Sequence, residues 1–139
     1  KKWLQLGGHA DGDSFLQRVA FREAIEESGI EDLKIVNLNF DKINRSKNLI
    51  VEESLTRSIL PIDIDIHVIP KTEKESEHFH YDVRFLFIAM TNQYFISHES
   101  IDLKWIKLTD ISTYTQEEST LRQINKVAFI IEKLADIDF

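Results

Sequence analysis

Three glutamates near the start of the chain offer carboxylate oxygens from neighbouring positions of one helix. Glu23, Glu26 and Glu27 are spaced i, i+3 and i+4, so at about 100° per residue they fall at roughly 0°, 300° and 40° around the helix axis. Like charges at these spacings destabilise a helix unless a cation lies between them. The spacing therefore predicts a site for a hard divalent cation, with a solvent-exposed acidic helix face as the alternative.

The helix that would carry these carboxylates is predicted from Phe15 to Ser28. This stretch contains neither Gly nor Pro, and Asp13 or Ser14 is placed to cap its N-terminus. Gly29 then supplies the left-handed residue that commonly ends a helix. Apolar residues occur on both sides of the predicted helix, with Leu16 and Ala20 on one side and Phe21 and Ile25 on the other. We therefore expect a rigid helix that is buried against more than one layer.

The segment from Gly8 to Ile30 resembles the Nudix box, the signature motif of the Nudix hydrolase superfamily. That motif reads Gly, five residues, Glu, seven residues, Arg-Glu, an apolar residue, any residue, Glu-Glu, any residue, Gly and an apolar residue. The matching positions are Gly8, Arg22, Glu23, Ala24, Glu26, Glu27, Gly29 and Ile30. Ser14 stands where the family has its first glutamate. Asp13 takes that role if the loop is one residue shorter, and otherwise Ser14 acts as a plain N-cap.

The resemblance implies a metal-dependent hydrolase of a nucleoside diphosphate linked to another group. It assigns Glu23, Glu26 and Glu27, together with the Gly8 carbonyl, as ligands of Mg²⁺ or Mn²⁺. Water attack on a pyrophosphate requires charge neutralisation, an activated water and in-line positioning. One of the glutamates, or a carboxylate outside the motif, takes the proton from that water.

Two residue assignments beyond the three glutamates follow from the same resemblance. Arg22 is expected to orient Glu23 through a charge-assisted hydrogen bond, the alternative being a direct contact with a substrate phosphate. A carboxylate beyond the motif often joins the metal site in this family, and Glu99 resembles that position best. Glu75 and Glu77 are the alternative candidates for this additional carboxylate. Arg22 and the three glutamates are thus the expected catalytic residues.

Histidines and aspartates alternate with apolar residues in two further stretches. Ile59 to Ile69 and Phe79 to Met90 read as strands, and a hairpin between them would place their polar residues on one face. Those residues are Asp65, His67, His80, Asp82 and Arg84. Such a face would line a substrate site or hold a second ion, with a solvated sheet face as the alternative. We expect His67, His80 and Arg84 to bind substrate, together with His9 unless His9 only caps its turn.

The remaining elements indicate an α/β chain. Further strands are predicted at Leu33 to Phe40 and Ile101 to Leu108, and a short helix at Leu49 to Leu55 within the polar excursion Asp41 to Arg57. A closing helix is predicted from Glu117 to Ile137. Its core side would carry Leu121, Ile124, Val127, Ala128, Ile131 and Leu134. The resemblance implies an α/β/α sandwich with a mixed β-sheet, formed as a single domain over residues 1–139. Because Nudix domains usually carry two or more strands before the motif, we expect N-terminal strands to be missing from this chain.

Composition limits the classes of function. The chain has 139 residues, a net charge of −7, 42% hydrophobic residues and no cysteine, which argues against a general basic surface for nucleic acid and against a thiolate site. No apolar run has the length of a membrane helix, so the expected compartment is the cytoplasm and the expected partner a small nucleotide-type molecule, with a homodimer as a further expectation. Two alternatives stay open: a catalytically silent Nudix-like module that binds a nucleotide or protein, and an isopentenyl-diphosphate-type isomerase, which normally needs a cysteine.

Overall fold

A computed structural model describes residues 3–38, 50–52, 55, 58–98 and 100–135 of the chain. The elements, in chain order, are α1 (Leu16–Ser28), β1 (Leu33–Asn37), β2 (Ile50–Glu52), β3 (Asp63–Ile69), β4 (His78–Arg84), β5 (Phe87–Ala89), the 3-10 helix η1 (Leu108–Thr113) and α3 (Glu118–Ala135). The expected α/β class is confirmed. No helix in the described part of the chain is long and apolar enough to cross a membrane.

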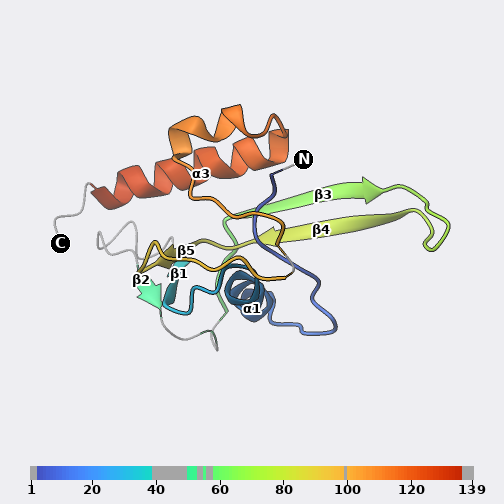
Figure 1. The fold of residues 1–139 in the computed structure, drawn as a ribbon, viewed down its shortest axis with the longest axis horizontal. Helices are drawn as coiled ribbons and strands as arrows, with labels where there is room; N and C mark the ends of the chain where they lie inside the picture. Colours follow the sequence, from blue (N-terminus) through green and yellow to red (C-terminus); the bar gives the residue numbers. More distant parts are fainter. Residues whose placement is uncertain (1–2, 39–49, 53–54, 56–57, 99, 136–139) are drawn as a thin grey trace.

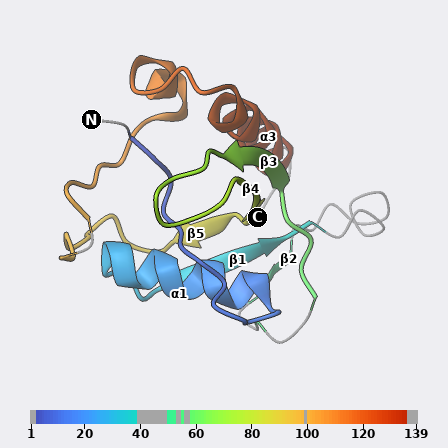
Figure 2. The ribbon, with the colours of Figure 1, turned by 90° about the vertical axis from the view of Figure 1, so that its right-hand side faces the viewer.

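The described strands form two small antiparallel sheets. One sheet has the order β2-β1-β5, and the other is the β3-β4 hairpin. All pairings between described strands are antiparallel, so the mixed sheet expected from the sequence is not seen in this part of the chain. Helices α1 and α3 lie on opposite sides of β1 and β5 (Figures 1 and 2). The rings of Phe21 on α1 and Phe87 on β5 lie 5.9 Å apart between centroids, which shows the contact on the α1 side.

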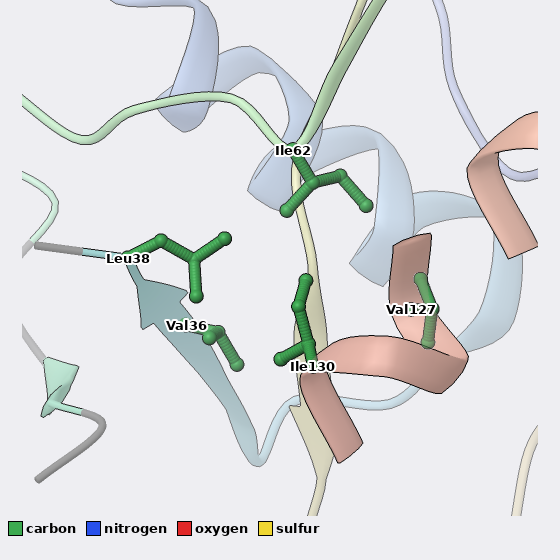
Figure 3. Packing of buried hydrophobic residues seen from close by; sticks show 5 residues of the cluster. All are labelled: Val36, Leu38, Ile62, Val127 and Ile130. Carbon is green, nitrogen blue, oxygen red and sulfur yellow. The ribbon is translucent and has the colours of Figure 1, made fainter. Parts of the chain in front are cut away.

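A small apolar core joins β1 to α3. It consists of Val36, Leu38, Ile62, Val127 and Ile130, which come from β1, the residues flanking β1 and β3, and α3 (Figure 3). Ile35 and Val36 are each only 1% exposed, because neighbouring residues of a strand point to opposite faces and both faces of β1 are covered. The helix α1 directly precedes this central strand in the chain and follows the loop of residues 7–12 that contains Gly7, Gly8 and Gly12, called the glycine loop below.

The predicted helix over Phe15 to Ser28 is confirmed as α1, with a different start. Phe15 occupies the N-cap position without a side-chain cap bond, whereas Asp13 or Ser14 was expected there. Asp13 Oδ1 instead accepts a hydrogen bond of 2.8 Å from the Phe15 N–H. At the other end Gly29 has φ 69° and donates to the Ile25 carbonyl at 2.7 Å, so the expected glycine stop is confirmed.

The predicted strand Phe79 to Met90 is interrupted. It divides into β4 and β5, because the chain changes partner between Arg84, which pairs with Asp63 of β3, and Phe87, which pairs with Ile35 of β1. The Leu86 carbonyl accepts from the Val36 N–H at 2.9 Å at this crossing. One predicted strand thus contributes to two sheets.

Three other expectations differ from the structure. Ile50–Glu52 is the strand β2, where a short helix was expected, and most of the excursion around it lies outside the described residues. The stretch Ile101 to Leu108 forms no strand. Its Trp105 indole donates to the Asn92 carbonyl at 2.8 Å, and the segment leads into η1. On α3 the buried stripe is Val127 and Ile130, whereas Ile131 is 46% exposed.

Within β3 the apolar side chains are exposed, and the buried residue is the polar one that begins the strand. Ile64, Ile66 and Val68 are each about half exposed, whereas Asp63 is only 4% exposed. The carboxylate is covered because basic side chains of α3 reach it. Lys126 Nζ lies 2.6 Å from Asp63 Oδ1, which compensates the cost of burying the charge.

Candidate metal and substrate site

Gly8 of the glycine loop lies directly against the Glu23 side chain of α1. A Cβ atom added to Gly8 would lie 2.1 Å from Glu23 Oε2 and 2.9 Å from Glu23 Oε1. Only a residue without a side chain leaves room for this carboxylate against the loop backbone. The Glu23 side chain is 13% exposed, so α1 presents one carboxylate in a largely enclosed position against the loop.

A second glutamate of α1 is held by the same loop. The Gly7 N–H donates to Glu27 Oε2 at 2.9 Å. A hydrogen bond from a backbone amide to a carboxylate is charge-assisted and stronger than one between neutral groups. Two successive glycines, Gly7 and Gly8, therefore contact two of the three glutamates that the sequence singled out.

Arg22 connects these groups. Its Nη2 donates to Glu23 Oε1 at 2.7 Å and to the His9 carbonyl at 3.2 Å, and its Nε lies 3.8 Å from Glu26 Oε2. The hydrogen bond to Glu23 is the main reason that the pKa of Arg22 lies above its ordinary value. The guanidinium thus spans the glycine loop and both carboxylates, a geometry that agrees with an orienting role for Arg22.

Asp13 forms its hydrogen bonds with Arg18 and with the backbone of Phe15. Its Oδ1 accepts from Arg18 Nη2 at 2.9 Å, and this hydrogen bond, followed by the one from the Phe15 N–H, lowers the pKa of Asp13 below its usual value. Asp13 therefore braces the start of α1 through Arg18. The structure shows no hydrogen bond between Asp13 and Arg22 among its described contacts, although Asp13 was the candidate to replace the family's first glutamate.

The donor set around Gly8 fits a hard cation in its chemistry. Glu23, Glu26 and Glu27 supply only carboxylate oxygens, which suit Mg²⁺ and Mn²⁺ better than softer metals. Glu26, with 53% of its side chain exposed, is open to solvent. Within the described residues, the one group of three or more potential ligands with donor atoms all within 4.8 Å is His67, His80 and Asp82. The three glutamates are thus neighbours but are not gathered to that degree.

His9 contacts both α1 and the β3-β4 hairpin. Its carbonyl accepts from Arg22, and its ring lies 5.7 Å from the ring of His80 between centroids. His80 is directly opposite His67 in the antiparallel register, and their rings are also 5.7 Å apart. The expected hairpin is therefore confirmed, and three of the four substrate-binding candidates, His9, His67 and His80, form a row of adjacent rings.

Arg84, the fourth substrate-binding candidate, lies in a buried ion-pair network. Its side chain is 5% exposed and its Nη1 lies 3.0 Å from Asp63 Oδ2, while Nη1 and Nη2 donate to the Ser119 carbonyl and hydroxyl, each at 3.1 Å. Arg84 Nε has no hydrogen-bond partner in the described structure. A guanidinium that is enclosed in this way holds the hairpin to α3, and we place it outside the substrate site.

Sequence reasoning missed the two basic residues of α3 that complete this network. Arg122 donates to Asp63 Oδ2 at 3.0 Å and to Asp65 Oδ1 at 2.9 Å, and Lys126 reaches Asp63 as described above. Burial raises the pKa of Asp63, but the hydrogen bonds from Arg122 and Lys126 outweigh it and hold that pKa at about 2. Their i, i+4 spacing was the available signal, because it places both cations on one helix face.

Of the three candidates for an additional carboxylate, the structure describes Glu75 and Glu77 and does not bring them to the site. Glu99 lies outside the described residues. Glu75 and Glu77 are exposed in the β3-β4 turn, where the Glu75 carbonyl accepts from the Thr72 N–H at 2.9 Å. Figure 1 shows this turn at the end of the projecting hairpin, away from α1.

Comparisons of the chain with models of known protein families, with curated proteins and with solved structures found no match.

Proposed function

We propose that the chain is a metal-dependent hydrolase of the Nudix type, which cleaves the pyrophosphate bond of a nucleoside diphosphate linked to another group. The observation that carries the proposal is the enclosed Glu23 carboxylate. It lies against the bare Cα of Gly8 and is held by Arg22. The first contact joins two positions of the Nudix-like motif that are fifteen residues apart, and the second joins its adjacent Arg-Glu pair.

In this proposal Glu23, Glu26, Glu27 and the Gly8 carbonyl hold Mg²⁺ or Mn²⁺. The bound cation would neutralise the charge of the pyrophosphate and lower the pKa of a bound water. Arg22 keeps the Glu23 carboxylate turned toward the glycine loop, and the Gly7 N–H does the same for Glu27. Since a chain of net charge −7 repels a polyanion, positively charged mediators at the site are a physical requirement for substrate binding.

The row of rings formed by His9, His67 and His80 supplies the substrate-binding wall in this proposal. Imidazoles donate hydrogen bonds to phosphate oxygens and stack against flat groups. His9 belongs to the glycine loop itself, and its ring contacts His80 of the hairpin. A substrate held at the glutamates through its phosphates would therefore meet these rings with its other end.

The experiment is a phosphate-release assay with Mg²⁺ across nucleotide sugars, dinucleoside polyphosphates, ADP-ribose and nucleoside triphosphates. We expect turnover of at least one substrate class. Glu26→Gln should lose this turnover, because Glu26 is a proposed metal ligand of the motif and its side chain is open to solvent. Glu132→Gln is the matched control, since Glu132 is an exposed glutamate on α3. Absence of turnover with every substrate, or equal activity of Glu26→Gln and wild type, would overturn the proposal.

A catalytically silent nucleotide-binding module is the second candidate. It is favoured by Ser14 at the position of the family's first glutamate and by the hydrogen bond that Asp13 accepts from Arg18. In that case, calorimetry would show binding of a nucleoside diphosphate in the presence of Mg²⁺, and the release assay would show no product. Binding with measurable turnover would exclude it.

A further inference from the structure

The hairpin brings a second set of metal ligands together, separate from the glutamates of α1. His67, His80 and Asp82 each offer one donor atom, and these atoms all lie within 4.8 Å of one another. The cross-strand register explains the grouping. His67 is directly opposite His80, and Asp82 follows His80 by two residues and so points to the same face.

This donor set differs in chemistry from the oxygen-only set on α1. Two imidazoles and one carboxylate suit Zn²⁺, Fe²⁺, Co²⁺ or Ni²⁺, whereas Mg²⁺ prefers oxygen ligands and bound water. In a tetrahedral zinc site the ligand atoms lie about 3.3–3.6 Å apart, since Zn–N and Zn–O distances are about 2.0–2.2 Å. The atoms in this group therefore need to approach by at most about 1.5 Å. Rotation of partly exposed side chains supplies this movement, because His67 is 43% exposed and Asp82 is 35% exposed.

A neighbouring carboxylate is placed to orient one of the ligands. Asp65 Oδ2 lies 3.3 Å from His67 Nδ1, and Asp65 Oδ1 is held in turn by Arg122 at 2.9 Å. A histidine that donates from Nδ1 to a carboxylate presents the lone pair of Nε2, and this arrangement is common behind metal-bound histidines. Asp65 thereby acts as a positioning residue for His67.

From these contacts we infer that His67, His80 and Asp82 form a binding site for a divalent first-row transition metal of the zinc class, independent of the proposed Mg²⁺ site on α1. Three protein ligands leave at least one coordination position open to water or to a small anionic molecule, as in catalytic zinc sites. The ring of His9 lies beside His80, so the open position lies close to the glycine loop. The site does not depend on the proposed hydrolase function.

The test uses the untagged chain with excess Mg²⁺ present, so that oxygen-only sites are filled. Co²⁺ is added and followed by its visible d–d absorption, and Zn²⁺ is added and followed by calorimetry. We expect one high-affinity equivalent of Zn²⁺ and a Co²⁺ spectrum that Zn²⁺ displaces. His80→Ala and His67→Ala should lose both signals, and Asp65→Asn should weaken zinc binding by roughly ten-fold to a hundred-fold.

Two controls separate this site from other metal binding. His78→Gln removes a histidine from the same strand, whose ring lies 5.2 Å from His80 but which is not one of the three ligands, and it should bind Zn²⁺ like wild type. Glu27→Gln, which alters the helix site, should also keep both signals. Equal zinc affinity of wild type and His80→Ala would overturn the inference, as would loss of the signals in Glu27→Gln with retention in His80→Ala. Circular dichroism of each variant checks that the fold is kept.

Discussion

The Glu23 carboxylate lies where a Gly8 side chain would be, with Glu23 Oε2 only 2.1 Å from the position of an added Cβ. The contact joins a loop residue to a helix residue fifteen positions later. It gives a physical reason for a glycine at this position that does not depend on backbone dihedral angles.

Gly8→Ala should therefore remove function while leaving the fold intact. The added methyl group displaces the end of a flexible side chain, so the free energy of unfolding should change by less than about 1 kcal/mol. The affinity of the α1 site for Mg²⁺ or Mn²⁺ and any pyrophosphohydrolase activity should fall sharply, because Glu23 can no longer occupy its place beside the glycine loop. Calorimetric metal titration and thermal unfolding of the same variant measure the two effects. Unchanged metal affinity would show that the contact is not used for metal binding.

Arg22→Lys tests whether the guanidinium positions the carboxylate. Lysine keeps the charge but cannot reach the His9 carbonyl and Glu23 through one planar group as Arg22 does. The maximal rate should fall roughly ten-fold to a hundred-fold, as is typical when a group behind a metal ligand is lost, with little change in KM. Arg18→Lys is the matched control, since Arg18 pairs with Asp13 on the same helix. A larger effect on KM than on the maximal rate would indicate a direct phosphate contact.

Asp63 should make stability depend on pH in the acid range. Its pKa is about 2 in the folded chain against an ordinary value of 3.8, so the folded state favours the charged form. This contribution of about 2 kcal/mol is fully present above the ordinary pKa and is lost as the pH falls toward 2. Denaturant unfolding at a series of acid pH values should show the loss in wild type and in Asp32→Asn, an exposed control. Asp63→Asn should lack this component.

Asp63→Asn should also have a lower free energy of unfolding than wild type at neutral pH. Asparagine removes the buried ion-pair partner of the enclosed Arg84 guanidinium and leaves it only the longer contact of 3.5 Å with Asp82 among the described ion pairs. Breaking a buried pair costs about 3–5 kcal/mol. An unfolding midpoint close to that of wild type would contradict the assignment of Arg84 to a structural network and would return it to the substrate-binding candidates.

Two adjacent isoleucines on α3 test how the helix is rotated. Ile130 is 8% exposed and packs with Val36, whereas Ile131 is 46% exposed. Ile130→Ala should cost about 2–5 kcal/mol, the usual range for a buried isoleucine, and Ile131→Ala less than about 1 kcal/mol. Denaturant unfolding of both variants gives the comparison. Equal costs, or a larger cost at Ile131, would favour the helix face that the sequence pattern suggested.

Local elements were predictable because their signals are local. A run without Gly or Pro that is followed by Gly29 specifies α1, and the alternation in DIDIHVI and HFHYDVR specifies β3 and β4. The division of the second run into β4 and β5 was not predictable, since it depends on two different partner strands. The N-cap was also missed, because Asp13 Oδ1 accepts from the Phe15 N–H and from Arg18 Nη2 instead.

By itself the sequence determined the types and spacing of the groups that could do chemistry: the glutamates of α1, the glycines before them and the histidines of the hairpin. Tertiary structure decided which of these groups meet. It placed Glu23 against Gly8, placed His67 opposite His80, and enclosed Arg84 with Asp63. A polar residue is buried at the start of β3 because Arg122 and Lys126 of α3, some sixty residues away in sequence, compensate the Asp63 charge. Spacing along one element cannot reveal such a partner, since the compensation is made between elements.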